Sequence, residues 1–280
     1  MFIPTTLRRA SLAACALLAP SLAAAQAAPA APAAPAPREL STDRPDRTES
    51  PHTVPAGRMQ VELDLVSYTR DRVREGGADL LSQGLGVGAA NLKLGLHRSV
   101  DLQLVAESYT ATRVEDATGG LVSRRRGPGV FAVRSKVSLW GNDGGRTALA
   151  VMPFVAFEEG ENGREVNGGL IVPLAVELAG GWGLGTMVEV DAARDAAGDA
   201  YDLSWIASVV LGRDLTDRLG GFVELYGERS GPGAAGRIAT LDGGLTYGLT
   251  PDVQLDGGVN VGLTAAAEDL HPFLGLSVRF

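Results

Sequence analysis

Charged side chains recur at every second position within the apolar stretches of this sequence. In residues 59–65, Glu62 and Asp64 alternate with Val61, Leu63 and Leu65. In a β-strand this spacing places the charges on one face, where they can bind or repel a solute electrostatically. The only two lysines of the chain belong to the set. The candidate inward-facing residues are Glu62, Asp64, Lys93, Arg134, Lys136, Glu177, Glu189, Asp202, Glu224, Asp242, Asp256 and Arg279.

Catalytic chemistry has less support in the sequence. A hydrolase of the serine type needs a nucleophile with a histidine within hydrogen-bond reach. The histidines are His52, His97 and His271, which fall in an N-terminal segment, a short turn and the last long connection. A metal site needs converging ligands, and three scattered histidines with a single cysteine do not supply them. We therefore expect no enzyme activity, no metal site and no cofactor.

The elements that must position the charges are strands. The alternation runs through residues 57–280 and predicts twelve strands, while helical spacing is absent. An apolar outer face and a charged inner face are typical of an all-β, up-and-down antiparallel transmembrane β-barrel, because in lipid every backbone polar group needs an internal partner. The alternative is a soluble β-sandwich with its charged face in water. Aromatic residues near strand ends suggest an interfacial girdle: Trp140, Trp182, Tyr201, Tyr226 and Tyr247.

The predicted connections alternate between long and tight. The long or polar ones cover residues 70–81, 112–128, 158–164, 192–199, 229–236 and 265–271, and the tight ones 97–100, 141–146, 179–181, 212–218 and 250–252. In outer-membrane barrels the long connections face outward and the short turns face the periplasm. Three consecutive arginines, 124–126, lie in one long connection, where they bind lipopolysaccharide phosphates or form a solvated loop tip.

The N-terminal residues predict export. Residues 1–27 have a positive start, an apolar stretch and an Ala-Gln-Ala cleavage site, so we expect a signal peptide. Residues 28–37 form an Ala/Pro-rich linker. Residues 38–56 are polar and rich in proline, with two interpretations. They fold into the lumen as a constriction, paired with inward groups such as Arg134 or Glu224, or they form a periplasmic lead-in that caps the lower rim.

The last strand ends on an aromatic residue. Phe280 is the final residue, and Val278 and Leu276 precede it at alternate positions. A terminal aromatic on an alternating strand resembles the signal that the outer-membrane barrel assembly machinery reads. We therefore expect Leu276, Val278 and Phe280 to form an assembly signal.

Residues 41–62, with the sequence STDRPDRTESPHTVPAGRMQVE, resemble the opening of the outer-membrane transporter family named for the meta-pathway of phenol degradation. Residues 269–280 and the turns at 215–219 and 249–253 are similar to that family too. The resemblance implies a barrel with a transport role. Its motif residues here are Thr42, Asp43, Arg44, Pro45, Asp46, Thr48, Glu49, Ser50 and Pro51.

Together these features predict an outer-membrane channel of a Gram-negative bacterium for passive passage of small solutes, with aromatic and other organic compounds as candidates. Inward glycines such as Gly95 and Gly275 would leave room in the lumen, and the acidic excess favours cations or neutral molecules. The alternatives are a plugged structural barrel without flux and a membrane-embedded hydrolase. A net charge of −8 argues against nucleic acid. The expected partners are lipid, lipopolysaccharide, the barrel assembly machinery and a solute.

Overall fold

A computed structural model describes residues 38–75, 77–107, 109–127, 129–160, 163–194, 200–229 and 236–280. The predicted signal peptide and linker lie outside these residues. The described residues contain strands, turns and irregular segments, and no helix long and apolar enough to cross a membrane. The strands are β1 (Met59–Glu75), β2 (Ala78–Val87), β3 (Ala89–His97), β4 (Val100–Ala106), β5 (Tyr109–Asp116), β6 (Leu121–Gly127), β7 (Phe131–Trp140), β8 (Thr147–Gly160), β9 (Gly163–Glu177), β10 (Trp182–Arg194), β11 (Tyr201–Asp214), β12 (Leu219–Arg229), β13 (Arg237–Thr250), β14 (Val253–Gly262) and β15 (Leu270–Arg279).

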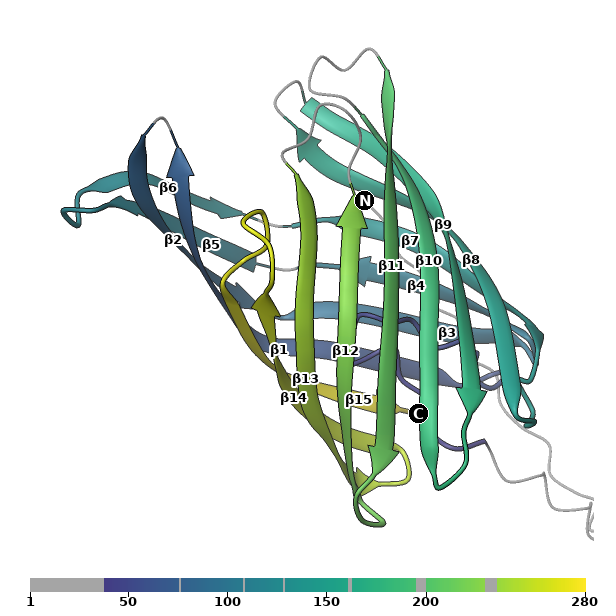
Figure 1. The fold of residues 1–280 in the computed structure, drawn as a ribbon. Coiled ribbons are helices and arrows are strands. Elements are labelled where there is room, and N and C mark those ends of the chain that lie inside the picture. Colours follow the sequence, from purple (N-terminus) through teal and green to yellow (C-terminus); the bar gives the residue numbers. More distant parts are fainter. Residues whose placement is uncertain are drawn as a thin grey trace, which may run out of the picture. The chain divides into compact units, whose positions relative to one another are not determined.

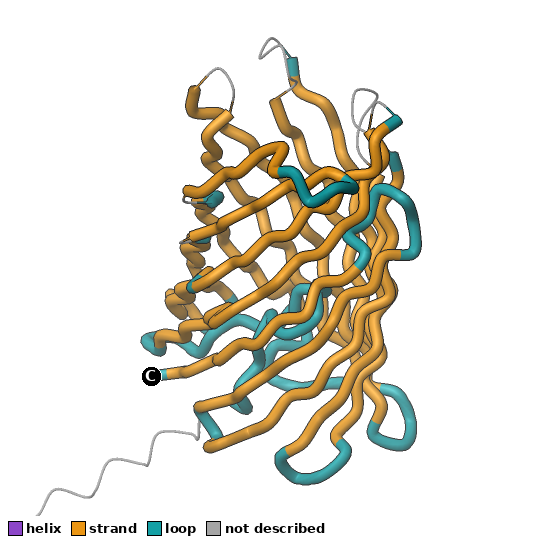
Figure 2. The backbone as a smooth tube through the Cα atoms, turned by 90° about the vertical axis from the view of Figure 1, so that its left-hand side faces the viewer, coloured by secondary structure: helices purple, strands orange, loops and turns teal. Residues whose placement is uncertain are grey.

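These strands form one closed antiparallel barrel. Each strand pairs with its neighbours around the sheet, and β15 pairs with β1 to close the ring. Three of the strands that span the barrel wall are interrupted midway, and their two halves carry separate labels: β2 and β3, β4 and β5, and β6 and β7. The fifteen labelled strands therefore make twelve spanning strands. The prediction of an all-β barrel of twelve strands is therefore confirmed. Figures 1 and 2 show the tilted strands and the C-terminus at the lower end.

The two-faced sequence pattern fits the barrel wall. On β12, Val223 and Leu225 are 58% and 50% exposed on the outer face, whereas Glu224 between them is 1% exposed. The outward leucines and valines need a lipid environment, because on a soluble protein they would form one apolar band. Trp140, Trp182, Tyr201 and Tyr247 also lie outside, each at least 43% exposed. Tyr226 does not belong to this girdle, because its side chain is buried in the interior.

The upper part of the wall differs from the predicted loops. Residues predicted as long connections at 70–81 and 112–128 belong largely to β1, β2, β5 and β6, and the connection predicted at 158–164 is the β8–β9 hairpin. The three arginines at 124–126 accordingly lie in β6 rather than in a loop. Parts of the connections predicted at 158–164, 192–199 and 229–236 fall outside the described residues. Strand β6 pairs with β5 alone among the described residues, so it is an edge of the upper extension.

The interruptions of the three strands lie side by side. Gly88, between β2 and β3, has a φ of 74° and donates its N–H to the carbonyl oxygen of Asp64 at 2.9 Å. Glu107 follows β4, and its backbone exchanges hydrogen bonds with Gly129 and Val130, each at 3.0 Å. Because the breaks are in register, the extension formed by β1, β2, β5 and β6 bends away as one unit (Figure 1).

Candidate functional site: a charged segment inside the lumen

Residues 38–56 lie inside the lower half of the barrel, and we call them the lumen segment. Its side chains and backbone meet inward side chains from β1, β3, β7, β12 and β14, which lie on different sides of the ring. Figure 1 shows this segment in purple within the strands. Val54, Thr48 and Thr53 are buried although they belong to no strand. The segment therefore occupies much of the lower lumen.

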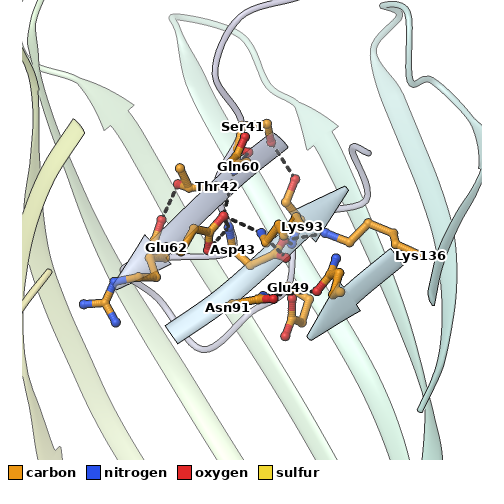
Figure 3. A network of polar contacts seen from close by, with 12 residues as sticks. Ser41, Thr42, Asp43, Glu49, Gln60, Glu62, Asn91, Lys93 and Lys136 are labelled. Carbon is orange, nitrogen blue, oxygen red and sulfur yellow. Dashed lines mark hydrogen bonds and ion pairs between the residues drawn. The ribbon is translucent and has the colours of Figure 1, made fainter. Parts of the chain in front are cut away.

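The centre of the segment is Asp43, which lies between the two lysines of the chain (Figure 3). The Lys93 and Lys136 ammonium groups each contact an Asp43 carboxylate oxygen at 2.5 Å. Lys93 also binds Glu62, which in turn accepts the Asp43 backbone N–H at 3.1 Å. Burial by itself would raise the pKa of Asp43, but Lys136 and Lys93 outweigh it and hold that pKa well below its usual range. Asp43 is therefore charged and fixed.

Further contacts fix the segment to the opposite wall. The Arg44 guanidinium donates to Asp256 on β14 at 2.9 Å. Glu224 on β12 accepts the backbone N–H groups of Arg47 and Thr48, each at 2.8 Å. These hydrogen bonds are charge-assisted and buried, so each is stronger than a hydrogen bond between neutral groups in water. The segment is thus bound from both sides of the lumen.

The remaining contacts lie above and below this centre. Glu49, at the upper side of the segment, binds Arg134 on β7 at 2.5 Å. At the lower side Val54 donates its N–H to Asp101 at 2.9 Å, and Thr53 donates its N–H to Asn142 at 3.0 Å. Arg279 on β15 donates to the carbonyl oxygens of residues 38 and 39 at 2.7 and 3.0 Å.

The sequence-predicted inward residues all occur on the inner face of the wall, and most of them contact the lumen segment. Those that bind the segment by hydrogen bond or ion pair are Glu62, Lys93, Arg134, Lys136, Glu224, Asp242, Asp256 and Arg279. Glu177 lines a lower cavity, while Glu189 and Asp64 line upper ones. Asp202 is half-buried on β11, opposite Ala193.

Several motif residues act inside the segment itself. The Ser41 and Ser50 hydroxyl groups are 2.8 Å apart, and the Thr42 hydroxyl donates to the Arg44 carbonyl oxygen at 2.5 Å. The Asp43 carboxylate also accepts the Ser50 N–H at 3.0 Å. The motif therefore carries both the internal turn and the contacts to the wall.

Two expectations need correction. The inward glycines Gly95 and Gly275 do not leave open space: a Cβ on Gly95 would lie 2.1 Å from the Pro55 carbonyl oxygen, and one on Gly275 would lie 2.1 Å from the Arg44 guanidinium. These glycines allow the segment to pack on the wall. His271 lies in β15 rather than in a connection, and it lines the upper cavity with its ring edge-on to Phe273.

The sequence did not reveal two further partners of the lumen segment. Asn142, in the β7–β8 turn, binds the Thr53 hydroxyl at 2.8 Å, and Ser208 on β11 lies 2.6 Å from the Thr48 hydroxyl. Neither has a distinguishing pattern in the sequence, since polar residues are common in turns and on inward faces. Only the closed barrel brings them to the segment.

The lumen that remains is divided by the segment. An upper cavity of about 790 Å³ has more acidic than basic residues in its lining, among them Glu49, Glu107, Glu189 and Glu228. A lower cavity of about 470 Å³ lies between the segment and β8–β12. Asp46 lines both of these cavities and a third near the lower turns. Burial first, and then the nearby Glu224 charge, raise the pKa of Asp46 well above its usual range.

No three His, Cys, Asp or Glu side chains gather as a potential metal site in the described part of the chain. The wall and the lumen segment define a class of protein. A closed barrel of twelve strands, apolar outside and polar inside, is an outer-membrane β-barrel.

Residues 42–280 match the family described as "Putative MetA-pathway of phenol degradation", and the chain belongs to this family. The predicted resemblance is therefore confirmed. The match begins at Thr42, so it includes the lumen segment from the start of its motif. A search of curated proteins finds no match.

Three solved structures are similar to the chain. An outer membrane channel from Pseudomonas putida F1 is 14% identical, with a TM-score of 0.57 over 82% of this chain and 97% of that chain. The NanC porin is 11% identical, with a TM-score of 0.47 over 78% and 98% of the two chains. The translocator domain of NalP from Neisseria meningitidis is 11% identical, with a TM-score of 0.48 over 79% and 88%. Of the three, the Pseudomonas putida channel alone has a TM-score above 0.5, and at 14% identity its likeness concerns the fold alone.

Proposed function

We propose that this protein is a passive outer-membrane channel for small solutes, narrowed by the lumen segment and selective for cations and neutral molecules over anions. The observation that carries the proposal is the position of Asp46. This carboxylate lines the acidic upper cavity and both cavities below it, so a solute that passes between them passes Asp46.

The wall beside Asp46 offers room for a passage. Gly183 on β10 and Gly212 on β11 are paired and line the lower cavities. A Cβ built on either glycine would meet no atom closer than 3.7 Å. These two positions differ from Gly95 and Gly275, where the segment packs directly on the wall. Solutes would therefore pass on the β10–β11 side of the segment.

The charges of the upper cavity support the selectivity. Its lining contains more carboxylates than cationic groups, and the cationic Arg134 is already paired with Glu49. A low-dielectric wall around an excess of one charge concentrates the opposite ion. Small aromatic or other organic compounds are candidate solutes because the family description refers to phenol degradation.

The test is the reversal potential of the purified protein in planar bilayers under a KCl gradient. The wild-type protein should conduct with a cation preference, and Asp46→Lys, which adds a positive charge whether Asp46 is ionised or neutral, should reduce or reverse that preference. Asp217→Lys, in an exposed turn at the lower end, is the matched control and should leave it unchanged. A folded barrel without conductance, or with an anion preference, would reject the proposal.

The solute class is tested separately in cells. A deletion strain grown on a panel of limiting carbon sources, phenolic compounds included, should grow more slowly on those that the channel admits. We further propose that export ends with cleavage after residue 27, for which the motif in residues 25–27 is the support. Mass spectrometry of the membrane-extracted protein should then give a chain that begins at residue 28.

A further inference from the structure

The outer face of the upper extension is rich in arginine. In β1, every second residue from 70 to 74 is an arginine. Thr69, Gly84 and Thr112 face inward together, since they line the same upper cavity and a Cβ on Gly84 would touch Thr69. The alternate positions on these strands therefore face outward. The register brings six outward arginines to this face: Arg70, Arg72, Arg74, Arg113, Arg124 and Arg126.

The middle of this face is a row that crosses all four strands. Arg70 pairs with Gln83, Gln83 with Arg113, and Arg113 with Arg124. Neighbouring strands are about 4.8 Å apart, so the row spans about 14 Å. Such a row can present several guanidinium groups to one ligand with more than one phosphate.

Few carboxylates oppose these arginines. Arg74 contacts Asp79 at 3.6 Å, and Arg113 contacts Glu115 within its own strand. Among the side chains that the structure describes, no carboxylate forms an ion pair with Arg70, Arg72, Arg124 or Arg126. The face thus keeps a positive excess on a chain whose net charge is −8.

The arginine face begins where the apolar wall ends. Directly below the row, the outward residues are Tyr68, Leu85 and Ala111 on β1, β2 and β5, with Arg126 beside them on the edge strand β6. Val87 and Tyr109 follow. Leu85, Val87 and Tyr109 are each more than 40% exposed. Exposed apolar and aromatic residues mark the lipid-facing band and its interface. The arginines are therefore at the level of the lipid head groups, at the end of the barrel opposite the C-terminus.

We propose that this face binds the phosphate groups of lipopolysaccharide in the outer leaflet. The guanidinium group matches phosphate in bidentate geometry and is charged at every physiological pH. Lipopolysaccharide carries its phosphates next to its acyl chains, which matches the step from the apolar band to the arginine row. The bound lipid would hold the free edge of the extension, where β6 has no second strand partner among the described residues.

The test compares the purified barrel with a triple variant of the row, Arg70→Gln/Arg113→Gln/Arg124→Gln. Binding is measured on immobilised vesicles that contain lipopolysaccharide, the same lipid after phosphatase treatment, or phosphatidylglycerol. The matched control is Arg125→Gln/Arg146→Gln/Arg218→Gln, which removes the same charge from the inner face of β6 and from the lower turns. Heat-modifiable migration on gels checks that each variant is folded.

We expect the row variant to bind intact lipopolysaccharide at least about tenfold more weakly than the wild type and the control, because three charge-assisted contacts are lost. Phosphatase treatment should weaken wild-type binding to a similar degree. The three single variants should each give part of the loss, so the result holds even if the triple variant fails to fold. Equal binding by wild type and row variants, or equal wild-type binding to phosphatidylglycerol, would overturn the proposal.

Discussion

Ion pairs of basic and acidic side chains occur both in the lower lumen and in the upper extension, but they are buried in the first and exposed in the second. In the lower lumen the Lys136 and Asp43 side chains are 1% and 5% exposed and lie 2.5 Å apart. In the upper extension the Arg74 and Asp79 side chains are both 77% exposed and lie 3.6 Å apart. A buried charge must keep its partner, whereas an exposed one is solvated by water. The lower charges therefore fix a segment of the chain, and the upper charges stay available to an external ligand.

The largest effect should come from removing a buried lysine. Lys93→Met leaves Asp43 and Glu62 without their shared partner, and breaking a buried ion pair costs roughly 3–5 kcal/mol. Arg74→Met, the matched variant in the extension, should change stability by about 0–1 kcal/mol. The temperature at which each barrel loses its fast migration on a gel measures both. Equal shifts of this temperature for the two variants would contradict the claim that the lower charges are structural and the upper ones are not.

A charge on the lipid-facing side should have the next largest effect, and it should depend on depth. Leu225 lies in the middle of β12 on the outer face, whereas Leu263 is just past the upper end of β14. Leu225→Arg should destabilise the folded barrel by about 2–4 kcal/mol, whereas Leu263→Arg should destabilise it by only about 0–1 kcal/mol. Urea-dependent folding into vesicles gives both values. A larger cost for Leu263→Arg would mean that the depth assignment is inverted.

The smallest effect concerns barrel closure at the lower end. The Phe280 N–H donates to the Met59 carbonyl oxygen at 2.7 Å, and Met59 donates back at 3.3 Å. Deleting Phe280 removes both bonds and the aromatic ring, whereas Phe280→Ala removes only the ring. Each lost hydrogen bond costs about 1 kcal/mol. The deletion should therefore destabilise the folded barrel by about 2 kcal/mol relative to Phe280→Ala.

The same two variants also test whether the Phe280 ring acts as the predicted assembly signal. If the ring is the signal, both variants should give a low yield in the outer membrane of cells while export continues. A normal cellular yield for Phe280→Ala, with a low yield only for the deletion, would mean that the ring is not an assembly signal. Phe280 would then act through the backbone hydrogen bonds that close the barrel.

The contrast between the regions also explains what the sequence could predict. Strands within the lipid must be apolar on one face, so alternations such as Val223-Glu224-Leu225 reveal them. At the edge of the extension both faces are polar: β6 carries Ser123 and Arg125 inward and Arg124 and Arg126 outward. No alternation marks such a strand, and for this reason these residues resemble a loop in the sequence.

The partners of the lumen segment were predictable only in part. The inward position of Lys93 and Lys136 follows from strand periodicity, and the polarity of residues 38–56 made a lumen position one of two alternatives. The individual pairs join residues far apart in the chain: Lys136 binds Asp43 across 93 positions, and Arg44 binds Asp256 across 212. Only closure of the barrel brings these residues together.

The most direct test of the account is the single-channel conductance of a protein that lacks residues 38–56, compared with the full mature chain in the same bilayer. The lumen segment occupies the lower lumen, so its removal should raise the conductance at least about twofold. Heat-modifiable migration confirms that the shortened protein has folded. A folded barrel that lacks the segment and keeps the conductance of the full chain would contradict the claim that the segment narrows the channel.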